Sequence, residues 1–443
     1  MVFVTIFNEE ENIMKIDIDN KLTLAKNAFK MWKDVPFAEK QLLIEKAARL
    51  FEARAEEFGA IITREMNKPI SQSVSEVKKC VRMMDYYSKV DNILLPQIME
   101  SEYQVSEMHF VPKGVVLGVM PWNFPFWQVL RFATPTLLAG NTVVMKHASI
   151  CFDSGDAIEQ IFLEAGFPEG VFQNLKVGHK EVEAILRNPI VRAVSLTGSG
   201  PAGGAVAGIA GKEIKKSLLE LGGSDAFIVL DDANLEEAAK VGTLARLQNC
   251  GQTCVAAKRF IVQDTVADKF TQLVIEEFAE YVPADKFDNE TRISGMARPD
   301  LADELQKQYD TAVANGAVVI IPLERISDIA FKPGLLKVNL DNPILQEELF
   351  GPVGMILVAN NDEEIVNIAN DIPFGLSNSV WTSDKDRQKY YYLNLESGTV
   401  NVNRMTSSDP RFPFGGTKSS GYGLELSELA LKEFVDAKMI IVK

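Results

Sequence analysis

From residue 114 onward, short apolar runs alternate with stretches of helical periodicity, and this alternation constrains the fold more than any other feature. Strand-like runs occupy 114–120 and 192–198, and a helical stretch follows at 235–249. A second such series follows residue 255, and within it a helix is expected over 267–282. Upstream of both series, apolar spacing over 44–62 predicts one long amphipathic helix. Alternating strand and helix signals are typical of parallel sheets with crossover helices. The sequence therefore predicts an α/β protein with two parallel-sheet units.

Charge and composition exclude several classes of function. The formal net charge is −15 and no basic run compensates it, so nucleic acid is not expected as a partner. Residues 1–15 lack the apolar core and small-residue cleavage site of a secretion signal. Residues 114–145 carry one charge, yet three prolines and three side-chain amides argue against a membrane span. With only four cysteines in 443 residues, we expect a cytoplasmic protein.

A glycine-rich stretch begins at the end of the strand-like run at 192–198. Gly198, Gly200 and Gly203 have the spacing of the dinucleotide-binding fingerprint and open a helical pattern. The motif alone is equally compatible with a turn whose small residues allow close helix packing. The confirming acid about twenty residues on would be Glu220, which lies in a different kind of sequence. In either case, the N–H groups at a helix start suit a phosphate.

Two cysteines, Cys250 and Cys254, lie four positions apart. Zinc needs three or four ligands, and the three histidines at 109, 147 and 179 are distant in sequence, so no metal is expected. A disulfide at this spacing would be strained and reduced in the cytoplasm. A buried structural cysteine and a nucleophile both remain open on this argument.

Six motifs resemble those of the aldehyde dehydrogenase superfamily, in the same order, from about residue 20 to the C-terminus. They are PWNFP at 121–125, GSGPAG at 198–203, ELGG at 220–223, NCGQTC at 249–254, EELFGPV at 347–353 and PFGGTKSSGYG at 413–423. The separation between Glu220 and Cys254 also matches the one these enzymes show between base and nucleophile. The resemblance implies a Rossmann-like cofactor domain, a catalytic domain and a β-strand oligomerisation arm.

The same resemblance implies three catalytic residues. Cys254 would add to the aldehyde carbonyl as a thiolate, because hydride can leave only after the carbonyl has become tetrahedral. Asn123 and the Cys254 backbone N–H would stabilise the alkoxide. Glu220 would activate the water that hydrolyses the thioester. Cys250 is interpreted as a bystander, or a thiol that traps Cys254 under oxidation.

NAD or NADP is the implied cofactor. Lys146 resembles the family lysine at the adenosine ribose, and Ser149 stands where members that prefer NAD often carry a glutamate. That glutamate would repel a 2′-phosphate, so its absence removes one barrier to NADP. The other implied cofactor-binding residues are Pro121, Trp122, Gly198, Ser199, Gly203, Leu221, Glu348 and Phe350.

Arg131 suggests a substrate with a distal carboxylate. Trp127 and Arg131 are four apart on one face of a predicted helix, and this arginine is shared with the succinate-semialdehyde dehydrogenases, whose bacterial branch the chain most resembles. That group has a second arginine where this chain has Gln248, so Ser407 or Ser408 would assist Arg131. The alternative is an Arg131 tied to an internal carboxylate.

The implied domains are discontinuous. Residues 1–93 and 113–221 would form the cofactor domain, residues 222–430 the catalytic domain, and 94–112 with 431–443 the oligomerisation element of a homodimer or homotetramer.

Three other functions remain open. One is a coenzyme-A-acylating dehydrogenase, which has less use for a base such as Glu220. The others are a broad-specificity aliphatic aldehyde dehydrogenase and a structural or scaffold protein on the same fold.

Overall fold

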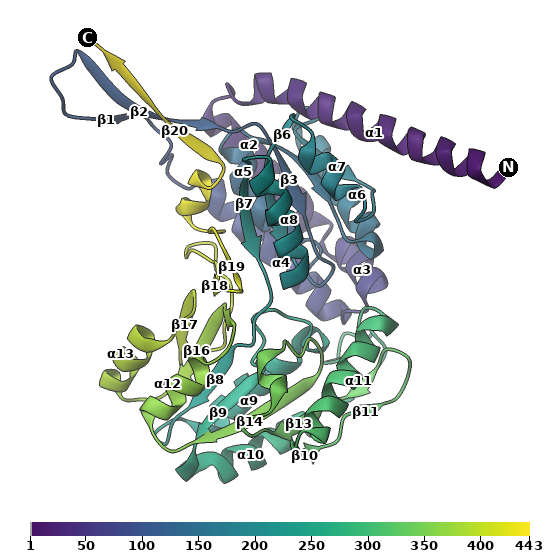
Figure 1. Ribbon diagram of the computed structural model, residues 1–443, viewed down its shortest axis with the longest axis vertical. Helices are drawn as coiled ribbons and strands as arrows, with labels where there is room; N and C mark the ends of the chain where they lie inside the picture. The colour runs from purple at the N-terminus through teal and green to yellow at the C-terminus, as the bar shows by residue number, and fades with distance from the viewer. Residues whose placement is uncertain (1) are drawn as a thin grey trace.

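A computed structural model describes the backbone of residues 2–443 and the side chains of residues 15–443. The chain forms two sheet-containing lobes and a projecting arm (Figure 1). The upper lobe holds a six-stranded sheet in which five strands are parallel and the edge strand β19 is antiparallel. In spatial order its strands are β19 (Gly421–Tyr422), β7 (Lys216–Glu220), β6 (Val191–Thr197), β3 (Val115–Val119), β4 (Thr142–Lys146) and β5 (Phe172–Leu175).

The lower lobe holds a seven-stranded sheet with one antiparallel edge strand, β10. In spatial order its strands are β10 (Val318–Ile321), β13 (Gly334–Lys337), β14 (Val353–Ala359), β9 (Arg259–Gln263), β8 (Ala226–Val229), β16 (Ser377–Trp381) and β17 (Thr399–Val402). Its helices are α9 (Leu235–Leu247), α10 (Asp264–Ala279), α11 (Pro299–Ala314), α12 (Asp362–Asn370) and α13 (Lys385–Asn394). The chain passes from the first sheet to the second between Glu220 and Ala226, and the cysteine-bearing segment follows after β8 and α9.

The predicted α/β class with two parallel-containing sheets is confirmed. The helix expected over 267–282 is α10, which begins three residues earlier. The single long helix expected over 44–62 is wrong. It is two helices, α2 (Phe37–Ala53) and α3 (Ala55–Met66), which meet at Arg54 with φ −112° and ψ 21°. The break turns the chain so that both helices pack against α4 (Ile70–Tyr87), an arrangement that apolar spacing alone does not reveal.

The upper lobe contains the remaining helices: α1 (Val2–Trp32), α5 (Trp127–Leu138), α6 (Phe152–Ala165), α7 (Val182–Arg187) and α8 (Gly200–Lys212). Helices α4 and α5 contact one another, and this pair forms one wall of the site described below.

A three-stranded antiparallel arm projects from the upper lobe and carries the C-terminus at its tip (Figure 1). It joins β1 (Gln97–Ile98), β2 (Val105–Pro112) and β20 (Val435–Val442). Two segments from opposite ends of the sequence therefore share one sheet. The domain boundaries themselves stay a prediction.

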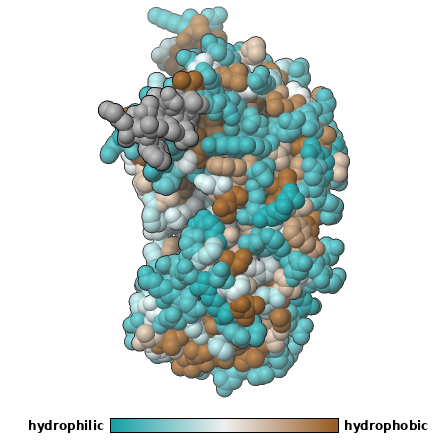
Figure 2. Space-filling view, turned by 90° about the vertical axis from the view of Figure 1, so that its right-hand side faces the viewer, coloured by the Kyte–Doolittle hydropathy of each residue, from teal (hydrophilic) through white to brown (hydrophobic). Residues whose placement is uncertain are grey.

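One face of the molecule is largely hydrophilic, with hydrophobic groups scattered over it (Figure 2). Among the helices of the described part of the chain, we find none long and apolar enough to cross a lipid bilayer.

Candidate active site

The segment carrying Cys254 is a tight loop after α9. Asn249 and Cys250 have φ values of 53° and 56°, and Gly251 follows at 72°. A Cβ on Gly251 would lie 2.4 Å from the Gly351 carbonyl oxygen, so only glycine fits there. The Asn249 side chain donates to the Asn123 carbonyl at 2.9 Å, which ties the loop to the 121–125 segment. This run of left-handed residues turns the chain so that Cys254 faces inward between the lobes.

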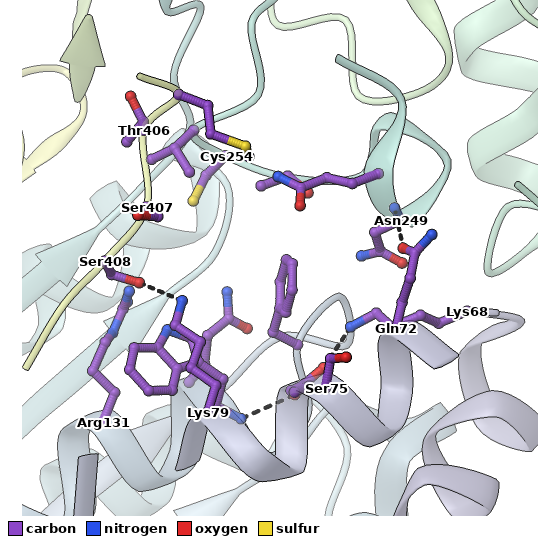
Figure 3. A pocket seen from close by; sticks show the side chains of 18 of the residues that line it. Lys68, Gln72, Ser75, Lys79, Arg131, Asn249, Cys254, Thr406, Ser407 and Ser408 are labelled. Atoms are coloured by element: carbon purple, nitrogen blue, oxygen red, sulfur yellow. Dashed lines mark hydrogen bonds and ion pairs between the residues drawn. The ribbon is translucent and has the colours of Figure 1, made fainter. Parts of the chain in front are cut away.

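Two cavities meet at Cys254. The first, which we call the cation-lined cavity, has a volume of about 390 Å³ and is shown in Figure 3. The second, the glycine-loop cavity, has a volume of about 250 Å³. Cys254 and Gln128 line both, so a group bound in either cavity can reach the half-buried thiol.

The surroundings of the Cys254 thiol favour its protonated form. Burial raises its pKa to about 11, against the opposing influence of the Arg131 and Lys258 cations. Lys258 is fully buried and donates to the Cys254 carbonyl at 2.6 Å and the Thr253 carbonyl at 2.9 Å. These bonds fix the backbone of the loop, while the sulfur remains between the two cavities.

Asn123 lies beside the cysteine loop and lines the glycine-loop cavity. Its amide donates to the Gln252 carbonyl at 3.0 Å. Because Gln252 belongs to the same turn as Cys254, this bond places the amide next to the nucleophile loop. An amide nitrogen has two hydrogens, so one is available for a second acceptor.

Glu220 ends β7 and is buried close to two other charges. Burial raises the pKa of its carboxyl to about 8, with Arg131 opposing and Glu425 reinforcing that rise. Its Oε1 has no hydrogen-bond partner among the described side chains and backbone groups. Among the described residues that line the two cavities, Glu220 is absent. The carboxyl is thus a poised but recessed group, electrostatically coupled to Cys254.

The glycine-loop cavity fits a phosphate. Ser199 is the N-cap of α8, and a Cβ on Gly200 would meet no atom within 4 Å, so the backbone at this helix start is open. The Thr197 hydroxyl, also in the lining, is buried without a partner among the residues described. Gly203 faces elsewhere, since its Cβ would lie 2.6 Å from Leu221. Gly203 therefore allows close packing of the helix, as one of the two interpretations of the motif expected. Gly198 and Ser199 line the cavity.

The rest of the glycine-loop cavity is apolar or neutral except for one carboxylate. Trp122 and Phe350 meet edge to face at 5.8 Å between ring centroids, and Pro121 and Leu221 also line the space. Glu348 accepts from the Gly223 N–H at 3.1 Å and pairs with Lys258 at 3.0 Å. A flat ring and a sugar hydroxyl are the chemistry that such walls accommodate.

Lys146 and Ser149 lie at the same edge of the upper sheet but outside both cavities. Lys146 ends β4 and is buried, and burial lowers its pKa while nearby Glu181 raises it. Ser149 is exposed at the start of the next turn. Because β3, β4 and β6 are parallel neighbours, their carboxyl ends bring Pro121, Lys146 and Gly198 to one edge, where open α/β sheets bind ligands.

The cation-lined cavity contains Arg131 and Trp127 from α5. Arg131 forms a buried ion pair with Glu425 through its Nε edge, and its guanidinium lies 4.7 Å from the Phe414 ring centroid. The internal carboxylate considered from the sequence is thus present. Glu76 accepts from the backbone N–H groups of Phe126 and Trp127 at 2.9 and 3.0 Å, which caps α5 and holds it in place.

Ser407 and Ser408 line the same cavity from the other side. Ser407 accepts from Arg404 at 2.6 Å, whereas Ser408 accepts from Lys79 at 2.7 Å. Ser408 is therefore the serine whose hydroxyl meets the cations of the cavity, as Figure 3 shows. Gln248 is in the lining as well.

Sequence reasoning missed Lys79, Lys258 and Glu425. Glu76 interrupts the mostly apolar buried stripe of α4, and half-buried Lys79 lies beside that stripe, so a charge among apolar residues was a detectable signal. Lys258 precedes β9 with no local feature that distinguishes it from an ordinary strand-end lysine. Glu425 is far from Arg131 in sequence, and only the tertiary fold brings the two side chains together.

Cys250 is buried apart from the cavities, with its sulfur 3.8 Å from the Ser294 carbonyl oxygen. Burial raises its pKa to about 12. It belongs to the hydrophobic core of the lower lobe, which agrees with the interpretation of a bystander.

Known proteins resemble this chain over almost its whole length. A sequence model described as the aldehyde dehydrogenase family matches residues 6–440. The chain is 42% identical over 430 residues to a Synechocystis protein named probable succinate-semialdehyde dehydrogenase (NADP+), covering 96% of this chain and 95% of that protein. It is 40% identical to the Escherichia coli succinate semialdehyde dehydrogenase (NAD(P)+) Sad, covering 96% and 93%.

A solved structure from Streptococcus pyogenes is similar over the same extent. It is described as succinic semialdehyde dehydrogenase in complex with NADP+, and it superimposes with a TM-score of 0.92 at 34% identity, covering 96% of this chain and 94% of that one.

Proposed function

We propose a function from the premise that this chain belongs to the aldehyde dehydrogenase family. It oxidises a small aldehyde with a distal carboxylate, succinate semialdehyde, to the dicarboxylate with NADP or NAD. The observation that carries this proposal is the position of Cys254, at the meeting point of a cation-lined cavity and a cavity that fits a dinucleotide. The names of the relatives supply the particular aldehyde.

Acylation begins when the Cys254 thiol gives its proton to water and the sulfur adds to the carbonyl carbon, which leaves the negative charge on the oxygen of a thiohemiacetal alkoxide. The free hydrogen of the Asn123 amide and the Cys254 backbone N–H stabilise the alkoxide. Lys258 donates a hydrogen bond to the Cys254 carbonyl, and this bond keeps the neighbouring backbone N–H in place. Bound nicotinamide supplies the acceptor for the hydride, and the alkoxide collapses to a thioester on Cys254.

Deacylation needs a base. Glu220 in its carboxylate form removes a proton from water, which attacks the thioester carbon and releases the acid and the Cys254 thiol. Because Glu220 is recessed, its side chain must turn toward the sulfur, or a water must bridge the two. Its open Oε1 and raised pKa suit a group that exchanges protons near neutral pH.

The cofactor would lie along the carboxyl edge of the upper sheet. Its pyrophosphate would meet Ser199 and Gly198, its nicotinamide would meet Trp122, Phe350 and Glu348, and its adenosine ribose would meet Lys146 and Ser149. Exposed, uncharged Ser149 leaves room for a 2′-phosphate, in agreement with the NADP named for the relatives.

The test is an aldehyde panel with both cofactors. We expect kcat/KM for succinate semialdehyde to exceed that for butanal, an uncharged aldehyde of equal carbon number, by roughly 30-fold or more, since a charge-assisted pair contributes about 2 kcal/mol or more. NADP should support turnover. A preference for butanal would instead indicate a general aliphatic aldehyde dehydrogenase.

We also propose a cytoplasmic homo-oligomer. The four cysteines are all free, which suits a reducing compartment. The arm of β1, β2 and β20 exposes apolar side chains, among them Ile98 at 86% and Ile441 at 58% exposure. An arm of this kind becomes stable when a second subunit covers it. Sedimentation analysis should show a dimer or tetramer that becomes monomeric when residues 94–112 are shortened.

A further inference from the structure

Lys79 is one of the charged groups of the cation-lined cavity that the sequence did not reveal. It extends from α4, donates from Nζ to the Ser408 hydroxyl at 2.7 Å, and holds Nζ 4.0 Å from the Trp127 ring centroid. Figure 3 shows Lys79 and Arg131 approaching Ser408 together, one from each helix of the wall. Two cations and a hydroxyl therefore converge on one end of the cavity.

The charge on Lys79 has no counter-ion within the protein. Lys68, in the same cavity, is paired with Glu76, and Arg131 is paired with Glu425. For Lys79, no carboxylate of residues 15–443 lies within ion-pair distance. The Lys79 side chain is half-buried, and an ammonium partly withdrawn from water beside a second cation is stabilised when an anion binds.

Charges of both signs act on Lys79. Burial, and next the Arg131 cation, lower its pKa to about 8, while Cys80, Glu76 and Cys254 act in the opposite direction. An anion bound between the two cations would relieve their mutual repulsion and raise this pKa.

We propose that Lys79 is a specificity-determining residue of this site, where its ammonium, with the Nη groups of Arg131 and the Ser408 hydroxyl, binds the distal carboxylate of the substrate. The inference rests on the proposed function and deepens it. Arg131 offers its Nη groups because the Glu425 pair uses the Nε edge. Ser408 accepts from Lys79 and keeps its own hydrogen for the carboxylate. Lys79 thus supplies the second cation at a site where Gln248 is neutral.

A structural role for Lys79 is the competing explanation. Its contact with Trp127 packs α4 against α5, and loss of that contact would affect every aldehyde equally. A carboxylate-binding role affects only the anionic aldehyde. The ratio of kcat/KM for succinate semialdehyde to kcat/KM for butanal therefore separates the two explanations.

The central experiment compares Lys79→Met with Lys78→Met. Lys78 is the adjacent residue on α4, exposed and 3.9 Å from Glu56, so its substitution makes the same charge change outside the cavity. Lys79→Met should lower the selectivity ratio roughly 10-fold or more, mainly by raising KM for succinate semialdehyde, as expected for loss of a hydrogen bond to a charged group. Lys78→Met should leave the ratio unchanged, and Lys79→Arg should restore most of it.

A pH series on the wild-type enzyme tests the same inference without a variant. The protonated form of Lys79 binds the carboxylate, so the selectivity ratio should fall as the pH rises through about 8. The groups facing Lys79 are Arg131 from α5, Cys254 from the loop, and Cys80 and Glu76 on α4. Ionisation of Cys254 acts on both aldehydes and cancels in the ratio. In Lys79→Arg the ratio should stay constant between pH 7 and 9.5, a range of about 2.5 pH units, because arginine remains charged.

The outcomes separate the two proposals. Wild-type enzyme with no preference for succinate semialdehyde would overturn the proposed function. A wild-type preference that survives in Lys79→Met, and that does not decline with pH, would overturn the role of Lys79 alone.

Discussion

The two cavities that meet at Cys254 differ in the chemical groups that line them. The cation-lined cavity has four cationic side chains, Lys68, Lys79, Arg82 and Arg131, and one carboxylate, Glu76. The glycine-loop cavity has one charged side chain, Glu348, and otherwise presents backbone, small polar groups and aromatic rings. In a protein with a net charge of −15, this concentration of cations is specific to one side of the thiol.

The difference between the two linings suits two different ligands, a small anion on one side of the thiol and a dinucleotide on the other. A small anion offers little surface, so the cavity that takes it must use charge. A dinucleotide offers a large surface and phosphates, so its cavity can use shape and open backbone N–H groups. Cys254 and Glu220 belong to neither recognition scheme, and substitutions there should damage every substrate alike, whereas substitutions in one cavity should affect only its own ligand.

The largest effect should come from Cys254→Ala, which removes the group that both cavities share. Without a thiohemiacetal no hydride can leave, so we expect NAD(P)H formation to fall by at least roughly 10⁴-fold with any aldehyde. Cys250→Ala, four residues away in the same loop, is the matched control and should retain most activity under reducing conditions. Near-normal turnover in Cys254→Ala would remove the nucleophile from the proposal.

Glu220→Gln should come next, with a loss of roughly 10²- to 10⁴-fold in steady-state turnover. A rapid-mixing experiment should still show a burst of up to one equivalent of reduced cofactor per site, because the thioester forms but is not hydrolysed. The carboxylate is the active form, so wild-type turnover should rise as the pH increases through about 8, and this rise should be absent in the variant. Loss of turnover without an acyl-enzyme would place Glu220 earlier in the cycle.

Arg131 tests the cation-lined cavity alone, but its pairing with Glu425 changes the design. Removing Arg131 by itself strands a buried carboxylate, which costs about 3 to 5 kcal/mol of stability. We therefore expect Arg131→Leu combined with Glu425→Gln to be the informative variant. Its kcat/KM ratio for succinate semialdehyde over butanal should fall by roughly 30-fold, the lower limit for a buried charge-assisted pair.

The control for this variant is Glu425→Gln alone, assayed with both aldehydes and by thermal unfolding. Equal losses on the two aldehydes in the double variant would make Arg131 a structural partner of Glu425 rather than a ligand of the substrate.

Much of this arrangement could be predicted from local sequence. Alternating apolar runs and helices predicted the α/β class, because strand and helix periodicity are local properties. Cys254, Asn123 and Ser199 lie in short motifs whose backbone conformations are set within a few residues. The antiparallel edge strands β10 and β19, and the break at Arg54, could not be predicted in this way, because strand pairing and helix packing depend on tertiary contacts.

The electrostatics of the site were the least predictable part. Arg131 was identifiable from its place in a motif, yet its ion pair with Glu425 joins segments that only the fold brings together. The Glu220 carboxyl likewise lies against Gly415 and Gly416, which are far from it in sequence. Charges act through space rather than along the chain, so spacing could indicate which groups matter but not what neutralises them.

The smallest expected effect lies at the far end of the glycine-loop side, where Ser149→Glu tests recognition of the cofactor. Ser149 is exposed, so a new carboxylate there would act on a 2′-phosphate through water, where two unit charges 4 Å apart interact by about 1 kcal/mol, roughly fivefold in affinity. We expect the ratio of kcat/KM with NAD to kcat/KM with NADP to rise by roughly 5- to 10-fold.

Ser149→Gln matches the size without the charge and should change the ratio far less. Selectivity between succinate semialdehyde and butanal should be the same in both variants, since the cation-lined cavity is untouched. A cofactor ratio that does not change in Ser149→Glu would show that the ribose lies elsewhere on the sheet edge, for instance closer to Glu181, whose charge already acts on Lys146.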